Sequence, residues 1–186
     1  DQPRSRGLGD VYKRQDIVHS LNVRSDNLYA ESVLRLLSLS AHEKGSAEKG
    51  IDIIRKYWQN YEADSLELFM YDGSGLARNN KVSAKYLNCV LKETARDSLI
   101  GEYFVQTLPL AGKEGSVATF MKHGELPGEL RLKSGSMSDV HAYAGYYTTP
   151  QNRYAIVVMI NNYTCTRAQL KQKISTLLTQ VLSKKE

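Results

Sequence analysis

Cysteine is scarce in this chain, since only Cys89 and Cys165 occur among 186 residues. Two cysteines give no disulfide framework, and without a second pair of metal ligands beside them each is best interpreted as a buried thiol. Long apolar runs are missing as well, because the longest, residues 155–160, is far shorter than the span of a bilayer. The four histidines show no metal-ligand spacing. We therefore expect no integral membrane segment, no metal and no cofactor.

A concentrated basic surface is also lacking. The formal net charge is +5, but residues 1–15 hold four basic and two acidic side chains, so the remainder carries only +3. The remaining basic residues are scattered among acids, which is typical of a solvated surface and not of nucleic-acid binding. Residues 1–15 show no helical or strand period and resemble translated sequencing-adapter sequence. We interpret them as a non-native leader outside the fold.

Residues 16–186 are expected to form one continuous domain, because no Pro/Ser-rich linker or internal repeat divides them. Apolar spacing predicts helices over 29–40, after an N-cap at Ser46, over 83–96, over 99–106 and after an N-cap at Thr166. Short apolar segments predict strands over 66–71, 129–133, 142–148 and 154–161, with a hairpin turn at 149–152. The fold class is therefore α/β in the α+β sense, with helices, including a C-terminal one, packed on an antiparallel sheet.

Two short motifs indicate chemistry. Lys133-Ser134-Gly135 ends an apolar, strand-like segment, and Ser25-Asp26-Asn27 lies far upstream. Ser-Asp-Asn and Lys-Thr-Gly, together with a Ser-x-x-Lys nucleophile, form one catalytic set in acyl-transferring serine enzymes. In that set the lysine holds positive potential beside the nucleophile, the hydroxyl residue binds a substrate carboxylate, and the glycine lets substrate backbone approach the strand. Two of the three motifs are thus present, in the expected order.

Each motif also has an ordinary structural interpretation. Ser25 and Asp26 are typical caps of a following helix. A Lys-Ser-Gly triplet alone is more often a strand end with a solvated lysine and a turn glycine. Residues 72–76 form a glycine-containing turn, which we interpret as structural, near the site but without direct chemistry.

Several segments in register favour the catalytic interpretation. RSDNLYAESVLRLL, YDGSGLARNN, LPLAG and LRLKSGSMSDVHAYAGYYTT occur in this order. Together they resemble the C-terminal half of a D-alanyl-D-alanine carboxypeptidase/endopeptidase of the class C penicillin-binding type. The resemblance covers nearly everything after residue 16. It implies a partial serine β-lactamase/transpeptidase-like fold, a periplasmic or exported protein, and peptidoglycan stem peptides and β-lactams as partners.

The resemblance also implies a role for each motif residue. Ser25 would relay a proton to the departing D-alanine amine, and Asn27 would orient the catalytic lysine and hold the substrate carbonyl. Lys133 would place its charge beside Ser25 and the substrate carboxylate. Ser134, Gly135 and Ser136 would bind substrate, the Ser136 backbone N–H supplying half of the oxyanion hole.

One part of the pattern is missing. Nothing before Ser25 supplies a Ser-x-x-Lys nucleophile, so we expect this chain to lack the N-terminal half of its own domain and to be inactive alone. Ser46-Ala47-Glu48-Lys49 matches Ser-x-x-Lys literally, but it follows Ser-Asp-Asn and is better interpreted as a helix N-cap. A noncatalytic peptidoglycan-binding module and a β-lactamase-like hydrolase remain as alternatives.

Overall fold

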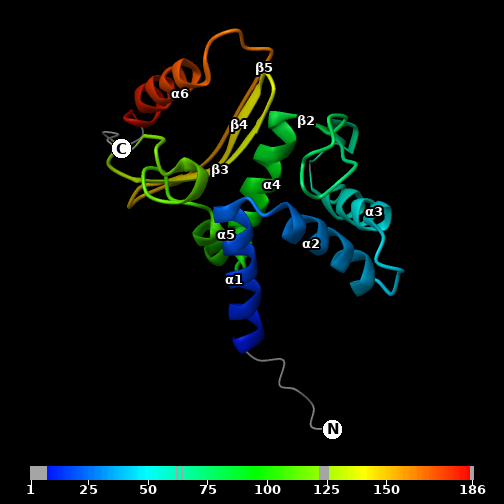
Figure 1. Cartoon of the computed structure of the whole chain (residues 1–186). Helices are drawn as coiled ribbons and strands as arrows, with labels where there is room; N and C mark the ends of the chain where they lie inside the picture. The colour runs from blue at the N-terminus through cyan, green and yellow to red at the C-terminus, as the bar shows by residue number, and fades with distance from the viewer. Residues whose placement is uncertain (1–7, 62, 64, 122–125, 185–186) are drawn as a thin grey trace.

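A three-stranded antiparallel sheet forms the centre of the computed structural model, which describes residues 8–61, 63, 65–121 and 126–184 (Figure 1). Its strands are β3 (Glu129–Met137), β4 (Val140–Thr148) and β5 (Arg153–Asn161), in the order β3-β4-β5. The three strands predicted from sequence are confirmed, and β3 continues four residues beyond Lys133. The predicted turn between β4 and β5 is closed by Thr149, whose backbone N–H donates to the Asn152 carbonyl at 2.8 Å.

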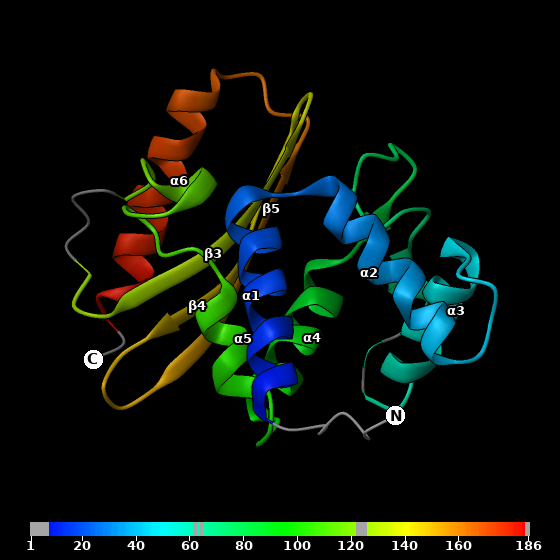
Figure 2. The same ribbon diagram turned by 60° about the horizontal axis from the view of Figure 1, so that its bottom comes forward.

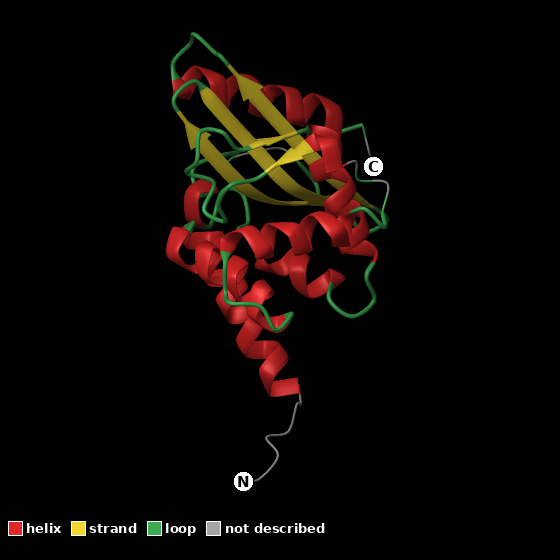
Figure 3. Ribbon diagram, turned by 90° about the vertical axis from the view of Figure 1, so that its right-hand side faces the viewer, coloured by secondary structure: helices red, strands yellow, loops and turns green. Residues whose placement is uncertain are grey.

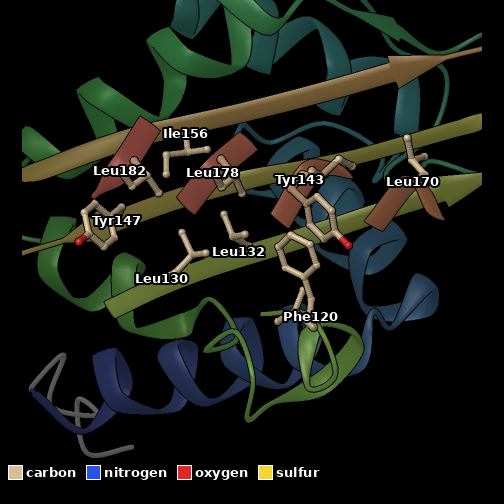
Figure 4. Close-up of a cluster of buried hydrophobic side chains, with 11 residues drawn as sticks. Phe120, Leu130, Leu132, Tyr143, Tyr147, Ile156, Leu170, Leu178 and Leu182 are labelled. Carbon is tan, nitrogen blue, oxygen red and sulfur yellow. The ribbon is translucent and has the colours of Figure 1, made fainter. Parts of the chain in front are cut away.

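Helix α6 (Arg167–Leu182) covers one face of this sheet (Figure 2). Its N-cap is Thr166, as predicted, and Gln169 completes a capping box by accepting from the Thr166 backbone N–H. Residues spaced three or four apart on α6 point at the sheet and meet apolar side chains of every strand (Figure 4). This cluster contains Leu130, Leu132, Tyr143, Tyr147, Ile156, Leu170, Ile174, Leu178 and Leu182. It forms the main hydrophobic core and fixes β3 in place.

The opposite face of the sheet packs on helices α4 (Ala84–Arg96) and α5 (Gly101–Thr107). Tyr146 of β4 is the centre of this second cluster, with 1% of its surface exposed. Its hydroxyl donates to the Leu91 carbonyl of α4 at 2.7 Å, and its ring meets Phe104 edge-on. Because side chains alternate along a strand, β4 contributes Tyr143 and Tyr147 to one core and Tyr146 to the other.

Helices α1 (Leu8–Arg24), α2 (Asn27–Ser40) and α3 (Ala47–Trp58) complete a helical lobe on the α4/α5 side of the sheet (Figure 3). Helix α1 packs along α5, and α2 crosses α3 closely. A Cβ atom at Gly50 would lie 2.3 Å from the Leu34 carbonyl oxygen, so only glycine permits this approach. Residues 1–15 were expected to lie outside the fold, but residues 8–15 form the first part of α1, which begins at Leu8. The non-native origin of that segment stays a prediction.

The remaining elements are short. Strands β1 (Leu68–Phe69) and β2 (Lys81–Val82) pair antiparallel, and a 3₁₀ turn, η1 (Ser65–Glu67), precedes β1. The strand predicted over 66–71 is therefore only two residues long. Among the described residues between α5 and β3, a 3₁₀ turn, η2, spans Gly115–Val117. Within the described residues, no helix is long and apolar enough to cross a membrane, and no cluster of three potential metal ligands occurs.

Candidate active site

Ser25 and Lys133 are in contact although 108 residues separate them. The Lys133 ammonium donates a hydrogen bond to the Ser25 hydroxyl oxygen. Ser25 lies in the short connection between α1 and α2, and its φ of +53° is in the left-handed region, which non-glycine residues adopt at a cost of about 1 kcal/mol or more. The next residue holds this connection rigid, because Asp26 caps α2 by accepting from the Tyr29 N–H at 3.0 Å. The Asp26 N–H also donates to the Leu21 carbonyl of α1 at 3.2 Å, so both flanking helices hold the backbone beside Ser25.

Lys133 is half-buried and has no acidic partner among the described residues. Its ammonium donates a second hydrogen bond to the Ser134 carbonyl at 2.9 Å. Burial lowers the pKa of Lys133 below the usual value for lysine. An ammonium that is partly desolvated and lacks a counter-ion attracts an anionic ligand strongly and gives up a proton more easily than a surface lysine.

The outer edge of β3 is covered over only part of its length. Leu130 accepts from the Ala111 N–H at 2.8 Å, and the Leu132 N–H donates to the Pro109 carbonyl at 3.0 Å. Backbone groups that point to one edge of a strand recur every second residue, so those of Ser134 and Ser136 point to this same edge. No described backbone group pairs with them there. The Ser136 N–H is therefore available to an extended ligand.

Ser134 has a hydroxyl partner that the sequence analysis did not identify. Its side-chain oxygen lies 2.7 Å from that of Ser116, in turn η2. The turn is held against α1, because a Cβ atom at Gly115 would lie 2.3 Å from the Val23 carbonyl oxygen. Ser116 belongs to neither of the two sequence motifs. Two hydroxyls at hydrogen-bonding distance provide paired donors for a carboxylate.

Gly135 and Asn27 are open to solvent. A Cβ atom at Gly135 would meet no atom within 4 Å, so packing within the chain does not require glycine there. Asn27 is the first residue of α2, is exposed, and has no side-chain hydrogen-bond partner among the residues that the structure describes. Ser25, Lys133 and Ser134 are thus held together by contacts within this chain, whereas the Asn27 amide is positioned only by its helix.

The turn at 72–76 is held by hydrogen bonds within the chain. Glu31 of α2 accepts from the backbone N–H groups of Gly73 and Ser74 at 2.9 and 3.0 Å. Burial of the Asp72 carboxylate opposes its ionisation, but hydrogen bonds from Asn80 and from backbone N–H groups outweigh burial and lower its pKa. These bonds support the structural interpretation of this turn and attach it to the helix that follows Ser25.

Ser46 is an N-cap, as predicted. Its hydroxyl accepts from the Lys49 backbone N–H at 3.0 Å at the start of α3. Helix α2, whose 14 residues span about 20 Å, separates Ser46 from Ser25. The Ser-x-x-Lys match at Ser46 therefore lies at the opposite end of α2 from Lys133.

The fold and the site together define a class. Penicillin-binding serine peptidases have an antiparallel sheet with a C-terminal helix on one face and a helical lobe on the other. They also place a Lys-Ser-Gly strand beside a hydroxyl, and this chain has all of these features. Residues 14–184 match the D-Ala-D-Ala carboxypeptidase 3 (S13) family, and the chain belongs to this family.

Individual relatives agree with this assignment. The chain is 27% identical over 169 residues to the D-alanyl-D-alanine carboxypeptidase DacB of Haemophilus influenzae, covering 88% of this chain and 35% of that protein. It is 26% identical over 144 residues to the D-alanyl-D-alanine carboxypeptidase of Actinomadura sp. strain R39, covering 75% of this chain and 27% of that protein. The chain thus spans about a third of the length of the curated relatives it matches.

Solved structures show the same fold. Penicillin-binding protein 4 of H. influenzae superposes with a TM-score of 0.77 at 24% identity, covering 90% of this chain and 39% of that one. The same protein in complex with a β-lactam gives a TM-score of 0.74 at 25% identity, covering 90% of this chain and 41% of that one. A predatory endopeptidase from Bdellovibrio bacteriovorus gives a TM-score of 0.71 at 19% identity, covering 91% of this chain and 43% of that one. The predicted transpeptidase-like fold is therefore confirmed.

Proposed function

We propose that the whole protein is a serine-type D-Ala-D-Ala carboxypeptidase/endopeptidase that acts on peptidoglycan stem peptides through an acyl-enzyme, in the periplasm or outside the cell. The chain described here would supply the proton relay and the groups that bind the substrate carboxylate. The observation that supports this most strongly is the hydrogen bond from Lys133 to Ser25. Family membership and the β-lactam complex of the H. influenzae relative support it further.

The proposed chemistry follows from the donors and acceptors at the site. A nucleophilic serine loses its proton to a neighbouring base and adds to the carbonyl of the terminal D-Ala-D-Ala bond. The C–N bond then breaks, and the departing amine takes a proton from the Ser25 hydroxyl, which is replenished by the relay. Because Lys133 donates to Ser25, its positive charge makes the hydroxyl proton of Ser25 easier to transfer. Asn27 would hold the substrate carbonyl during the same step.

The strand residues would hold the substrate. The carboxylate of the terminal D-alanine would lie between the Lys133 ammonium and the hydroxyls of Ser134 and Ser136, in charge-assisted hydrogen bonds. The Ser136 N–H on the open edge would stabilise the developing oxyanion, and such a donor typically contributes a hundredfold to a thousandfold in rate. Gly135, without a side chain, would leave room for the substrate backbone.

The nucleophile is proposed to lie outside this sequence, since no Ser-x-x-Lys precedes Ser25. We expect that a fluorescent penicillin does not label the 186-residue chain covalently. Extending the chain with the upstream part of its own gene should create labelling at a serine in a Ser-x-x-Lys motif. Labelling at Ser46 in the short chain would overturn the assignment of the nucleophile.

Substrate recognition is tested separately from catalysis. A peptide that ends in D-Ala-D-Ala should bind the chain noncovalently in calorimetry, and its L-Ala-L-Ala isomer should bind more weakly. Lys133→Met should weaken binding at least about tenfold, because it removes the charge that pairs with the carboxylate. Lys173→Met, at an exposed position of α6, is the matched control and should bind like the parent. Equal affinities for the two variants would exclude the proposed carboxylate site.

The same two assays separate the alternatives. If the upstream part of the gene also lacks a Ser-x-x-Lys motif, a noncatalytic peptidoglycan-binding module is favoured, which would bind the peptide but stay unlabelled even after extension. A β-lactamase-like hydrolase would, after extension, turn over β-lactams rapidly instead of retaining the label. A long-lived label together with release of D-alanine is the result expected for the carboxypeptidase.

A further inference from the structure

An aromatic cluster lies at the C-terminal end of α3, away from the candidate active site. Tyr57, Trp58 and Tyr61 have ring centroids 5.1 to 5.5 Å apart, and the hydroxyls of Tyr57 and Tyr61 are 3.3 Å apart. Tyr57 is 51% exposed. Rings that support each other and remain open to water form a rigid apolar surface with polar tips, as is typical of a binding site.

The cluster lines one end of a longer groove. This end has a volume of about 350 Å³ and is closed by Leu37 of α2 and by Glu93 and Asp97 at the end of α4. An adjoining hollow of about 430 Å³ shares Tyr61 and Glu93 with it. Both volumes lie in the range of ligand sites. The two hollows adjoin at Tyr61 and Glu93, between the C-terminal end of α3 and the length of α4, and together they are called the groove below.

The second half of the groove is polar, and its side chains offer both donors and acceptors. Asn60 and Asn88 line it, and the Asn88 amide N–H donates to the Ala155 carbonyl at 3.4 Å, which leaves its amide oxygen as an acceptor. Lys92 also lines it and forms no ion pair with any described residue. Arg96 also lines it but is paired with Glu93 at 2.6 Å. An entirely apolar partner would leave these groups desolvated without hydrogen bonds, which is costly. The groove therefore suits a ligand with apolar faces and many hydroxyl, amide and carboxylate groups.

We propose that this groove binds a chain of N-acetylated amino sugars bearing carboxylates, the glycan to which stem peptides are attached. The C–H face of a pyranose ring packs on an aromatic face, here that of Tyr57 or Trp58. The Asp97 carboxylate accepts from sugar hydroxyls, Asn88 pairs with an N-acetyl amide, and Lys92 pairs with a carboxylate substituent. That the natural ligand is peptidoglycan rests on the proposed function. Recognition of N-acetylated sugars by this groove is independent of the proposed function.

The single tryptophan of the chain, Trp58, makes the test direct. Titration with tri-N-acetylchitotriose should change tryptophan fluorescence in a saturable manner, whereas maltotriose, which lacks N-acetyl groups, should not. Tyr57→Ala should weaken binding roughly tenfold or more, and Tyr57→Phe, which keeps the ring, should bind like the parent. Tyr71→Ala is the matched control, because Tyr71 is 59% exposed but does not line the groove.

The outcomes distinguish this site from the peptidase site. Lys133→Met should leave the chitotriose response unchanged, so loss of D-Ala-D-Ala binding in that variant tests the proposed function alone. No saturable response to chitotriose, an equal response to maltotriose, or equal binding by Tyr57→Ala and Tyr71→Ala would each overturn the glycan assignment. Circular dichroism of each variant verifies that the fold is retained.

Discussion

Two buried tyrosines of β4 provide a sharp test of how the sheet is held to the helical lobe. Tyr146→Phe removes the hydroxyl that donates to the Leu91 carbonyl at 2.7 Å. A neutral hydrogen bond contributes about 0.5–1.5 kcal/mol net. In a regular helix the Leu91 carbonyl also accepts from the N–H four residues on, so it does not become fully unpaired. We therefore expect Tyr146→Phe to lower the free energy of unfolding by about 1 kcal/mol.

Tyr143 is the matched comparison on the same strand. Like Tyr146 it is 1% exposed, but its hydroxyl has no hydrogen-bond partner among the described residues. Burial raises the pKa of Tyr143 to about 12. Burying a hydroxyl without a hydrogen bond costs about 1–3 kcal/mol in mutational data, so Tyr143→Phe relieves a cost and loses no bond. We expect this variant to be as stable as the parent or about 1 kcal/mol more stable.

Urea unfolding followed by circular dichroism measures both variants. The expected order is Tyr143→Phe, parent, Tyr146→Phe, with up to about 2 kcal/mol between the extremes. In a chain of this length about 1 kcal/mol also shifts the melting temperature by roughly 2–4 °C. The slopes of the transitions should agree, since neither change alters the surface exposed on unfolding. Equal destabilisation by the two substitutions would refute the assignment of hydrogen bonds at these hydroxyls.

Three further predictions follow from buried or close-packed positions. Burial, followed by the charges of Lys171 and Arg167, lowers the pKa of His141, so in acid the unfolded chain binds more protons than the folded one. The contribution of His141 to the free energy of unfolding should be complete above pH about 6.5 and fall as the pH drops through the folded-state pKa. The urea midpoints at pH 7 and pH 5 should therefore differ less in His141→Phe than in the parent. Gly73→Ala should lower the free energy of unfolding in urea by about 1–3 kcal/mol, because its Cβ atom would lie 2.7 Å from the Ala30 carbonyl oxygen. Gly135→Ala, whose Cβ atom would meet no atom within 4 Å, should change it by less than about 0.5 kcal/mol. In an NMR titration the Lys133 amine should lose its proton at lower pH than exposed lysines, because burial lowers its pKa, and an unshifted titration would contradict the partly buried environment.

The sequence predicted the elements whose apolar residues repeat with a regular period and are buried. The three strands of the main sheet and α6 were found because their apolar residues repeat with the period of the element and face one of the two cores. The end of β3 was missed because residues 134–136 are polar. They remain in the strand because β4 pairs with them, Ser134 opposite Tyr143 and Ser136 opposite His141. Their strand conformation is thus set by a neighbour and not by their own propensity.

The contact between Ser25 and Lys133 could be predicted from the sequence, whereas the contact between Ser134 and Ser116 could not. Ser25 and Lys133 were predicted to converge because the motifs identify residue types that act together. The partner Ser116 was missed because its position depends on how Gly115 packs against Val23, a contact that no local pattern reveals. All of α1 was missed because its sequence shows no amphipathic period, so its helical conformation could not be inferred from patterning.

The open half of β3 connects the fold to the proposed function. An edge strand with unpaired backbone groups invites aggregation, and proteins usually cover such edges. Here residues 109–111 cover the outer edge as far as Leu132, and the outward-facing backbone groups of Ser134 and Ser136, directly beyond Lys133, have no backbone partner among the described residues. An extended peptide could pair with this edge as an additional strand, and Gly135 would present no side chain to it. In the proposed function, the ammonium of Lys133 would then meet the carboxylate at the end of that peptide, so strand pairing and charge would both favour a peptide with a free C-terminus.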